Sequence, residues 1–387
     1  MTIAGWARQP RARRNASLVF APPFLLVLPL ALLLVPRSSL SGQDTALPQL
    51  KTRPAGPASV PPGGSDRQII LDVQVSDQSG APVRELSEQE FTLLEDNRPQ
   101  KIVSFNSVNA GATALSDPPV EIILVVDAVN ASLQVVNYER DQVKKFLLRN
   151  GGQLAQPVSL VFFSGAETAQ TRFANPSSRD GNALAVLYDQ YETGLRATNL
   201  NRGAFGAEER FDLSHNVLKR LAEHESTRPG RKLVIWLSPG WPLLSGINTL
   251  SPKQEQRFFD AIVAASTELR QARITLYSVN PLRPEDVAQT RSTLYQEFLK
   301  GVTSPSQALP GALGLQVLAV QSGGRVLNFP GDLTTAIADC AADGDSFYVF
   351  SFSPVPANHE NEYHSFRVTV EKPEMTARTR AGYYAQP

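Results

Sequence analysis

The first clear pattern along the chain is an alternation of apolar and polar side chains. The apolar side chains of residues 69–75 occupy every second position, as they do on one face of a half-buried β-strand. Two more short strand patterns follow at residues 91–95 and 101–105, each after a polar turn. Three short strands cannot cover their own apolar face. The pattern therefore predicts an N-terminal β half-domain over residues 67–110 that needs further cover.

Beyond residue 117 the pattern changes to alternating strands and helices. Residues 120–126 are almost continuously apolar, which is typical of a central parallel strand buried on both faces. This order predicts an α/β domain over residues 118–343, with a doubly wound, mostly parallel, Rossmann-like sheet. The further strands are expected at 158–163, 232–237, 274–279 and 325–328, and the helices at 136–148, 179–191, 213–224, 251–271, 313–321 and 332–342.

The C-terminal residues 346–385 return to a strand pattern. Strands are expected at 346–352, 365–370 and 376–380, again too few to cover one apolar face. The ends of a compact domain usually lie close together, so the two β half-domains on either side of the α/β domain can meet. We therefore expect one small antiparallel β-sandwich, formed by N-terminal and C-terminal strands, with the α/β domain inserted between its halves.

The N-terminal segment has the character of an export signal. Arginines precede an apolar run at residues 18–35, and small residues follow it, which predicts a signal peptide over residues 1–42. The run is about 18 residues long, the short end for crossing a bilayer, so a retained anchor is the alternative and membrane contact is expected only in that case. Residues 43–66 read as a proline-rich, disordered linker. We expect a secreted or periplasmic protein.

Composition and charge exclude several classes of function. The chain has 37 basic and 37 acidic residues and no net charge, so a nucleic-acid partner is not expected. Its one cysteine, Cys340, rules out an intrachain disulfide and a cysteine-rich zinc site, and its place among apolar helix residues predicts a buried thiol. The four histidines match no zinc-protease motif, and no nucleophile elbow or phosphate loop occurs. We expect no enzyme, although a triad assembled in space remains a hypothesis.

Five segments of the α/β part form an ordered set, namely residues 122–127 (IILVVD), 158–164, 230–238, 274–279 and 322–325. Together they resemble a von Willebrand factor type A (vWA) domain, the first being similar to the family's strand that ends in aspartate and the last to its glycine pair. The flanks at 71–100 and 378–384 resemble the start and the close of the acidobacterial VWFA-related family. The resemblance covers roughly residues 68–385 and implies a doubly wound fold.

The resemblance also implies a place for a metal-ion-dependent adhesion site. The family binds Mg²⁺ through an aspartate, serines two and four residues later, a threonine from a second loop and an aspartate from a third. Here Asp127 matches the first aspartate, but Val129 and Ala131 stand at the serine positions and Pro239 at the third-loop aspartate. We therefore expect a degenerate site and no cofactor, with Asp127 capping the next helix or accepting a hydrogen bond from a loop amide.

A rebuilt metal site is the alternative. It would bind Mg²⁺ or Ca²⁺ weakly through oxygen ligands from Asp127, Asn130, Ser132 and Asp212. A further acidic cluster at Asp339, Asp343 and Asp345 lacks a calcium-loop pattern, and we expect these residues to be solvated around a helix end.

Trp241 follows the C-terminal end of a predicted strand, where open α/β sheets bind ligands. It would either anchor a partner or pack under its loop, whereas Trp236 is expected in the core. The leading hypothesis is an exported protein–protein binding module of adhesion or scaffold type, with Asp127, Asn130 and Trp241 as candidate partner-binding residues. The partner is an unidentified protein. A structural component of cell-envelope assembly and a hydrolase are the alternatives.

Overall fold

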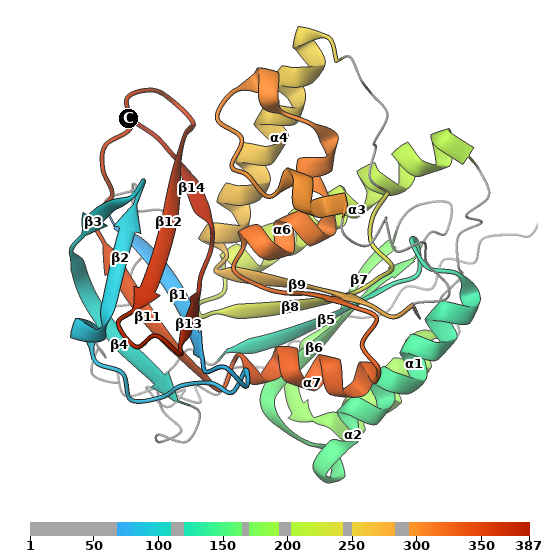
Figure 1. The fold of residues 1–387 in the computed structure, drawn as a ribbon. Coiled ribbons are helices and arrows are strands. Elements are labelled where there is room, and N and C mark those ends of the chain that lie inside the picture. The colour runs from blue at the N-terminus through green and yellow to red at the C-terminus, as the bar shows by residue number, and fades with distance from the viewer. Residues whose placement is uncertain (1–67, 110–119, 165–169, 193–202, 243–249, 283–293) are drawn as a thin grey trace, which may run out of the picture. The chain divides into compact units, whose positions relative to one another are not determined.

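The computed structural model describes residues 68–109, 120–164, 170–192, 203–242, 250–282 and 294–387 (Figure 1). The predicted signal peptide (1–42) and linker (43–66) lie outside these described residues. Within the described ranges, no helix combines the length and the apolar character that crossing a membrane requires.

The α/β part is built on a six-stranded sheet with the strand order β10-β9-β8-β5-β6-β7. Five strands run parallel, and β7 pairs antiparallel with β6 at one edge. Every residue of β5 and β8 is buried, which explains their continuous apolar sequences and confirms the predicted class of fold. The strands are β5 (Glu121–Asp127), β6 (Gln153–Ser164), β7 (Gln170–Asp180), β8 (Lys232–Leu237), β9 (Ile274–Asn280) and β10 (Val326–Asn328).

Helices cover both faces of this sheet (Figure 1). Apolar residues of α1 (Leu133–Leu147), α2 (Gly181–Glu192) and α7 (Leu333–Ala342) pack on one face, where the predicted buried thiol of Cys340 is confirmed. Those of α3 (Gly203–Ser226), α4 (Pro252–Gln271) and α6 (Leu315–Gln321) pack on the other. Short 3₁₀ helices lie at Glu88–Glu90, Arg149–Gly152, Leu294–Phe298, Pro305–Gln307 and Pro310–Leu313.

A glycine pair allows the last strand of the sheet to approach its neighbour. Gly323, directly after α6, has a φ of +89°, a conformation that strains other residues. A Cβ atom on Gly324 would lie 1.8 Å from the carbonyl oxygen of Leu276 in β9. The pair therefore lets the chain turn tightly and run into β10 beside β9.

Two four-stranded sheets make up the rest of the described chain, with the orders β13-β1-β11-β4 and β14-β12-β2-β3. Each sheet combines strands from before and after the α/β part, with β1 paired to β11 and β2 paired to β12. The predicted antiparallel β-sandwich is therefore confirmed. Its strands are β1 (Ile69–Ser76), β2 (Phe91–Glu95), β3 (Arg98–Gln100), β4 (Ile102–Asn109), β11 (Ser346–Phe352), β12 (Glu362–Val370), β13 (Thr376–Arg378) and β14 (Gly382–Ala385).

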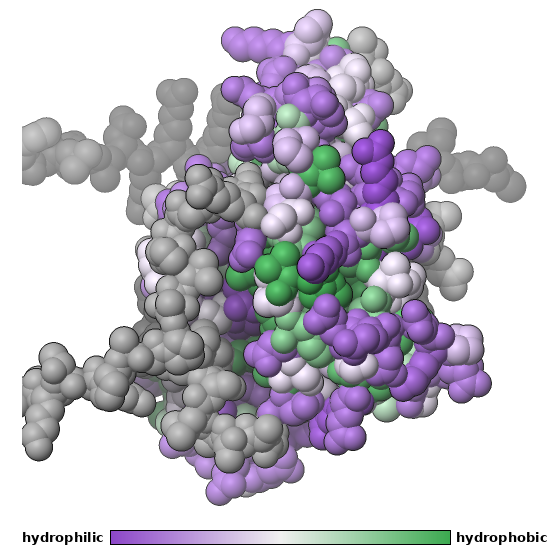
Figure 2. Space-filling view, turned by 90° about the vertical axis from the view of Figure 1, so that its left-hand side faces the viewer, coloured by the Kyte–Doolittle hydropathy of each residue, from purple (hydrophilic) through white to green (hydrophobic). Residues whose placement is uncertain are grey.

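An aromatic group from both sheets fills part of the sandwich core. The ring of Phe91 in β2 lies 5.0 Å from that of Tyr348 and 4.9 Å from that of Phe350, both in β11. Phe105 of β4 stacks on the same two rings. Figure 2 looks onto the side of the two four-stranded sheets and shows hydrophobic residues at its centre among hydrophilic ones.

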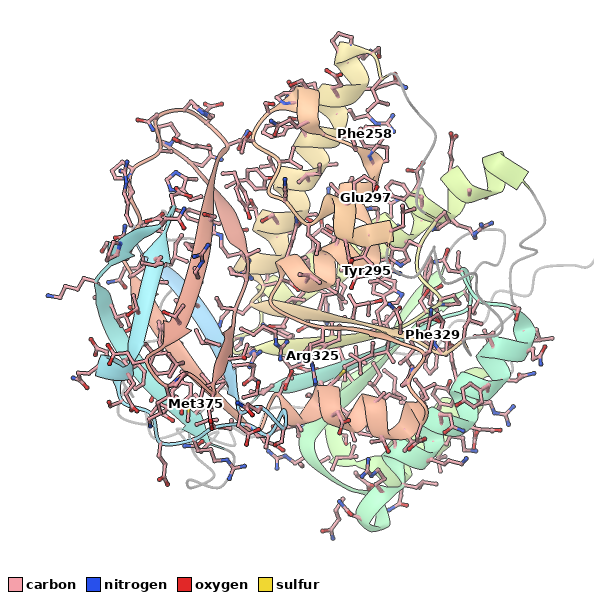
Figure 3. The ribbon with its side chains drawn as sticks, in the orientation of Figure 1. Phe258, Tyr295, Glu297, Arg325, Phe329 and Met375 are labelled. Atoms are coloured by element: carbon pink, nitrogen blue, oxygen red, sulfur yellow. The ribbon has the colours of Figure 1, made fainter. Side chains whose placement is uncertain are left out.

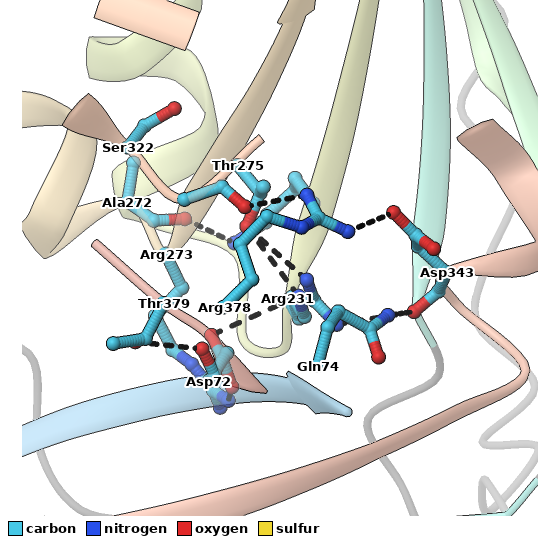
Figure 4. Close-up of polar contacts among 12 residues, drawn as sticks. Asp72, Gln74, Arg231, Ala272, Arg273, Thr275, Ser322, Asp343, Arg378 and Thr379 are labelled. Carbon is cyan, nitrogen blue, oxygen red and sulfur yellow. Dashed lines mark hydrogen bonds and ion pairs between the residues drawn. The ribbon is translucent and has the colours of Figure 1, made fainter. Parts of the chain in front are cut away.

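The sandwich contacts the α/β part at the N-terminal ends of β8 and β9. Asp72 of β1 is paired with Arg273, the residue before β9, and lies 4.0 Å from Arg231, just before β8 (Figure 4). Burial would raise the pKa of Asp72, but the two guanidinium groups outweigh it and hold the pKa below its usual value. This junction lies at the opposite end of the sheet from Asp127, the last residue of β5.

Asp343 is a second centre of the same junction. It follows α7, and its Oδ2 accepts hydrogen bonds from Arg378 of β13 at 2.6 Å and from Tyr277 of β9 at 2.8 Å. Arg325 reaches the end of α7, with Nη2 3.5 Å from the Asp343 carboxylate (Figure 3). The expectation of a solvated cluster is therefore wrong for Asp343. Two arginines and a tyrosine hydroxyl that are distant from it in sequence contact its carboxylate.

Three strands escaped prediction from the sequence. β3 has only three residues and contains Pro99, and β14 has four residues. The third, β7, lacks apolar alternation and contains Pro176, so its pattern did not predict a strand. All three pair at sheet edges, where sequence patterns are weakest.

Candidate functional site

Asp127 ends the central strand β5 and is fully buried at the C-terminal edge of the parallel sheet. Its Oδ1 accepts hydrogen bonds from the backbone amides of Val129 and Asn130, each at 3.0 Å. Of the two roles expected for Asp127, the hydrogen bond to a loop amide is confirmed, because the cap of α1 is Ser132. Asp127 therefore shapes the turn that leaves β5.

The second carboxylate oxygen of Asp127 accepts hydrogen bonds from side chains. Asn130 Nδ2 donates at 2.8 Å, and the indole Nε1 of Trp236 donates at 3.0 Å from the neighbouring strand β8. Burial raises the pKa of Asp127, although hydrogen bonds from Asn130, Trp236 and Ser238 act in the opposite direction. Trp236 is in the core as expected, but its contact with Asp127 was not foreseen. A buried indole N–H needs a hydrogen-bond acceptor, and this requirement could have pointed from Trp236 to a nearby carboxylate.

A serine of α3 extends this group. Asn130 Nδ2 also donates to Ser214 Oγ at 2.9 Å, and Ser214 Oγ donates to the carbonyl of Arg210 at 2.7 Å. Asn130 Oδ1 is buried and accepts no hydrogen bond from any described residue. Sequence analysis missed Ser214, since its distance along the chain from Asn130 provides no spacing to recognise.

The rebuilt metal set is not brought together. Ser132 is exposed and caps α1, its Oγ accepting from the amide of Val135 at 3.4 Å. Asp212 is exposed on α3, two residues before the buried Ser214, and so points to the other side of that helix. Of the four proposed ligands only Asp127 and Asn130 are in contact, and the grouping with Ser132 and Asp212 was wrong. Within the described ranges, no group of three or more histidine, cysteine, aspartate or glutamate side chains is placed to hold a metal ion.

The donors around Asp127 do not fit a divalent cation. Each carboxylate oxygen already accepts two N–H hydrogen bonds, two from amides and two from side chains. A cation needs the same oxygen lone pairs and would have to displace these donors. Val129 and Ala131, two and four residues after Asp127, have apolar side chains and are fully buried, so they offer no oxygen ligand.

Trp241 packs under its loop and is only 3% exposed. Its ring lies edge-on to Trp236, with centroids 5.0 Å apart, and 5.3 Å from the ring of His215. Of the two placements considered for this side chain, the structure has the buried one. Four rings from α3 and from the end of β8 contact one another in a chain that reaches Asp127 through Trp236. We call them the aromatic cluster: Phe211, His215, Trp236 and Trp241.

Glu139 is a buried carboxyl group that sequence analysis overlooked. It is fully buried on α1, and neither carboxylate oxygen has a hydrogen-bond partner among the described residues. Burial raises its pKa well above the usual value, and the charge of Asp127 acts in the same direction. Its spacing along the helix could have indicated burial, because Glu139 falls three residues after buried Val136 and four before buried Val143.

His364 is buried and His215 is half-buried, and neither is paired with a nucleophile among the described residues. His215 faces the carbonyl of Leu313 at 2.9 Å through Nε2, and burial lowers its pKa. His364 contacts Glu95 Oε1 at 3.0 Å within the sandwich, and the same oxygen accepts from Tyr383 at 2.9 Å. Among the described residues, neither ring is hydrogen-bonded to a serine, threonine or cysteine. The hydrogen bonds of both histidines link parts of the fold to one another.

No protein-family model matches the sequence, and no curated protein matches it significantly. Among similar solved structures is the human COPII-coat protein Sec24c, with TM-score 0.33 and 10% identity over 70% of this chain and 44% of that one. The pilus adhesin SpaC from Lactobacillus rhamnosus GG, in its open conformation, has TM-score 0.37 and 11% identity over 79% and 49%. Manganese-loaded TRAP protein from Plasmodium vivax has TM-score 0.34 and 10% identity over 76% and 99%. The chain spans less than half of the Sec24c and SpaC chains.

Proposed function

We propose that this chain is an exported, non-catalytic protein-binding module of the vWA type, which binds its partner without a metal ion. The observation that carries the proposal is the Asp127 carboxylate, buried at the C-terminal end of β5 and held by four N–H donors. Open α/β sheets bind ligands at this edge of the sheet. The junction with the sandwich lies at the other edge, so it leaves these loops to a partner.

The hydrogen bonds of Asp127 give the binding loops a fixed arrangement. The carboxylate joins the turn after β5 to Trp236 of β8, and through Asn130 to Ser214 of α3. Binding by preformed loops avoids the entropy cost of ordering them on contact. In this proposal Asp127, Asn130 and Trp241 act by positioning the surface from beneath, because all three are buried.

The partner would contact the exposed residues of these loops. Leu133, the first residue of α1, is 58% exposed and directly follows the turn that Asp127 shapes. An exposed leucine beside exposed Ser132 suits a protein surface with an apolar pocket. The zero net charge gives no reason to expect a nucleic acid. We place the partner in the periplasm or outside the cell, in keeping with the export signal expected at residues 1–42.

Site-specific photo-cross-linking in the native cell envelope tests the proposal. A photoreactive residue at position 133 should yield discrete cross-linked proteins, identified by mass spectrometry. Position 186 is the matched control, because Val186 on α2 is equally exposed at 59% and lies away from the turn after β5. Leu133→Lys should abolish recovery of the same proteins, and Val186→Lys should leave it unchanged. Identical products from both positions would refute binding at this edge.

A further inference from the structure

Among the described residues, the three sheets end in six edge strands, namely β3, β4, β7, β10, β13 and β14. An edge strand presents unpaired backbone groups, and natural proteins protect it by shortness, charge, proline or cover. Three of the six, β3, β10 and β13, have three residues each. All four residues of β14 are buried, and β7 contains Arg172, Pro176 and Arg179. Five edges are therefore protected in one of these ways.

β4 has few of these protections. It is eight residues long, reads Ile-Val-Ser-Phe-Asn-Ser-Val-Asn, and contains neither a charged residue nor a proline. A bulge near Val103 interrupts its pairing with β11, but from Ser104 to Asn109 the register is regular. Within the described part of the chain, no strand pairs with its outer side. Six consecutive residues therefore form a regular, uncharged edge.

Apolar side chains accompany this edge. Val103 is 51% exposed and is the large hydrophobic residue of the described sandwich with the greatest exposure. Phe105 is partly exposed, although it stacks on Tyr348 and Phe350 of the core. A strand added to β4 would take the exposed parts of Val103 and Phe105 out of water as well as pair the backbone.

We propose that β4 pairs in antiparallel fashion with β4 of a second copy of this chain. The added strand must itself offer a free, uncharged edge, and β4 of another copy does so. In a two-fold pair each strand faces its own sequence, which here brings no like charges together. The linker at 43–66 is a poor occupant, since each of its five prolines lacks an N–H donor. This proposal does not depend on the function of the Asp127 edge.

A pair of six-residue strands is a small interface, so the dimer should be weak and reversible. Sedimentation velocity from low to high micromolar concentration should show a monomer–dimer equilibrium of the full chain. Ser107→Lys places like charges across the two-fold pair and should leave the chain monomeric throughout. Val186→Lys, at an equally accessible site on α2, should dimerise as the wild type does. A wild type that stays monomeric throughout, or a folded Ser107→Lys variant that still dimerises, would overturn the proposal.

Thiol cross-linking tests the same contact without adding charge. The native Cys340 is fully buried, so an introduced cysteine is the accessible thiol. Asn106→Cys should be joined into a covalent dimer by a short bifunctional thiol reagent, because the two copies of residue 106 would lie on paired strands. Val186→Cys should remain a monomer under the same treatment. Equal cross-linking at both positions, or none at position 106, would contradict pairing through β4.

Discussion

The indole Nε1 of Trp236 lies 3.0 Å from Asp127 Oδ2, and this hydrogen bond joins the ends of two neighbouring parallel strands. The resemblance of the sequence to vWA domains implied that Asp127 stands where those domains hold a metal ion. Here a neutral N–H donor from β8 occupies one of its lone pairs, and Asn130 occupies another. The carboxylate thereby accepts all its hydrogen bonds from within the protein and supports the loop that leaves β5.

Trp236→Phe should destabilise the fold more than Trp241→Phe. Trp236 and Trp241 are both buried, and both substitutions remove similar volume, but of the two indoles only that of Trp236 has a hydrogen-bond partner among the described residues. Loss of a donor to a buried carboxylate should cost about 1–3 kcal/mol beyond the packing loss that the two variants share. Urea unfolding of both variants measures the difference. Equal losses of stability would show that the hydrogen bond to Asp127 contributes nothing.

Divalent metal should have little effect on stability. A cation at Asp127 must displace N–H donors, so we expect affinity no better than roughly millimolar, as in weak extracellular calcium modules. A cation at its dissociation constant adds only about 0.4 kcal/mol to the free energy of unfolding. Melting curves with EDTA, Mg²⁺ or Ca²⁺ should nearly superimpose, and Asp127→Ala should respond to metal as the wild type does. Micromolar binding by calorimetry that disappears in Asp127→Ala would refute this.

Glu139 should make the protein less stable as pH rises. Its pKa in the folded state is well above the usual value of 4.5, so the folded state retains a proton that the unfolded chain releases. From about pH 4.5 up to the folded pKa, the free energy of unfolding should fall by about 1.4 kcal/mol per pH unit from this group. The penalty is absent at lower pH, where both states are protonated.

The substitution Glu139→Gln keeps the volume of the side chain and removes its ionisable carboxyl group. Chemical denaturation at a series of pH values should show a flatter profile for this variant and greater stability than wild type at neutral pH. Asp127, whose pKa is also raised, titrates in both proteins, so the difference between the profiles reports Glu139 together with its interaction with the charge of Asp127. Parallel profiles would mean that Glu139 is not protonated in the folded state.

Removal of residues 346–387 should unfold the N-terminal strands and leave the α/β part folded. Both neighbours of β1, the one neighbour of β4 and one neighbour of β2 belong to the deleted segment. Hydrogen exchange should find the amides of β1, β2 and β4 unprotected and those of β5, β8 and β9 protected. A chain lacking only Gln386 and Pro387 is the control, because both follow β14. Protected amides in β1 after the larger deletion would contradict the shared sandwich.

The parallel strands of the α/β part and the joining of the two β halves could be predicted because each depends on a local pattern. The apolar run of β5 is recognisable in seven residues. The need for a shared sandwich follows from the small number of strands on each side. Even the burial of Trp236 and Cys340 followed from their place in apolar elements.

The contacts of the candidate site could not be predicted, because they depend on how distant elements meet. The hydrogen bond from Trp236 to Asp127 depends on the register of β8 against β5. Ser214 reaches Asn130 from a long helix whose rotation the sequence does not determine. Asp343 looked like a solvated carboxylate, and its cation Arg378 lies in a strand of the sandwich.

The α/β part begins and ends at two residues that face each other across β4 and β11, and this has a consequence for protein engineering. Asn109 at the end of β4 stands opposite Ser346 at the start of β11, and Ser346 Oγ donates to Asn109 Oδ1 at 3.0 Å. In an ordinary hairpin these two residues would be joined by a tight turn. The whole α/β domain stands in place of that turn, so exchanging it would preserve the strand pairing of both sheets, provided that new partners are supplied for Asp72 and Arg378, which pair with Arg273 and Asp343 of the exchanged domain.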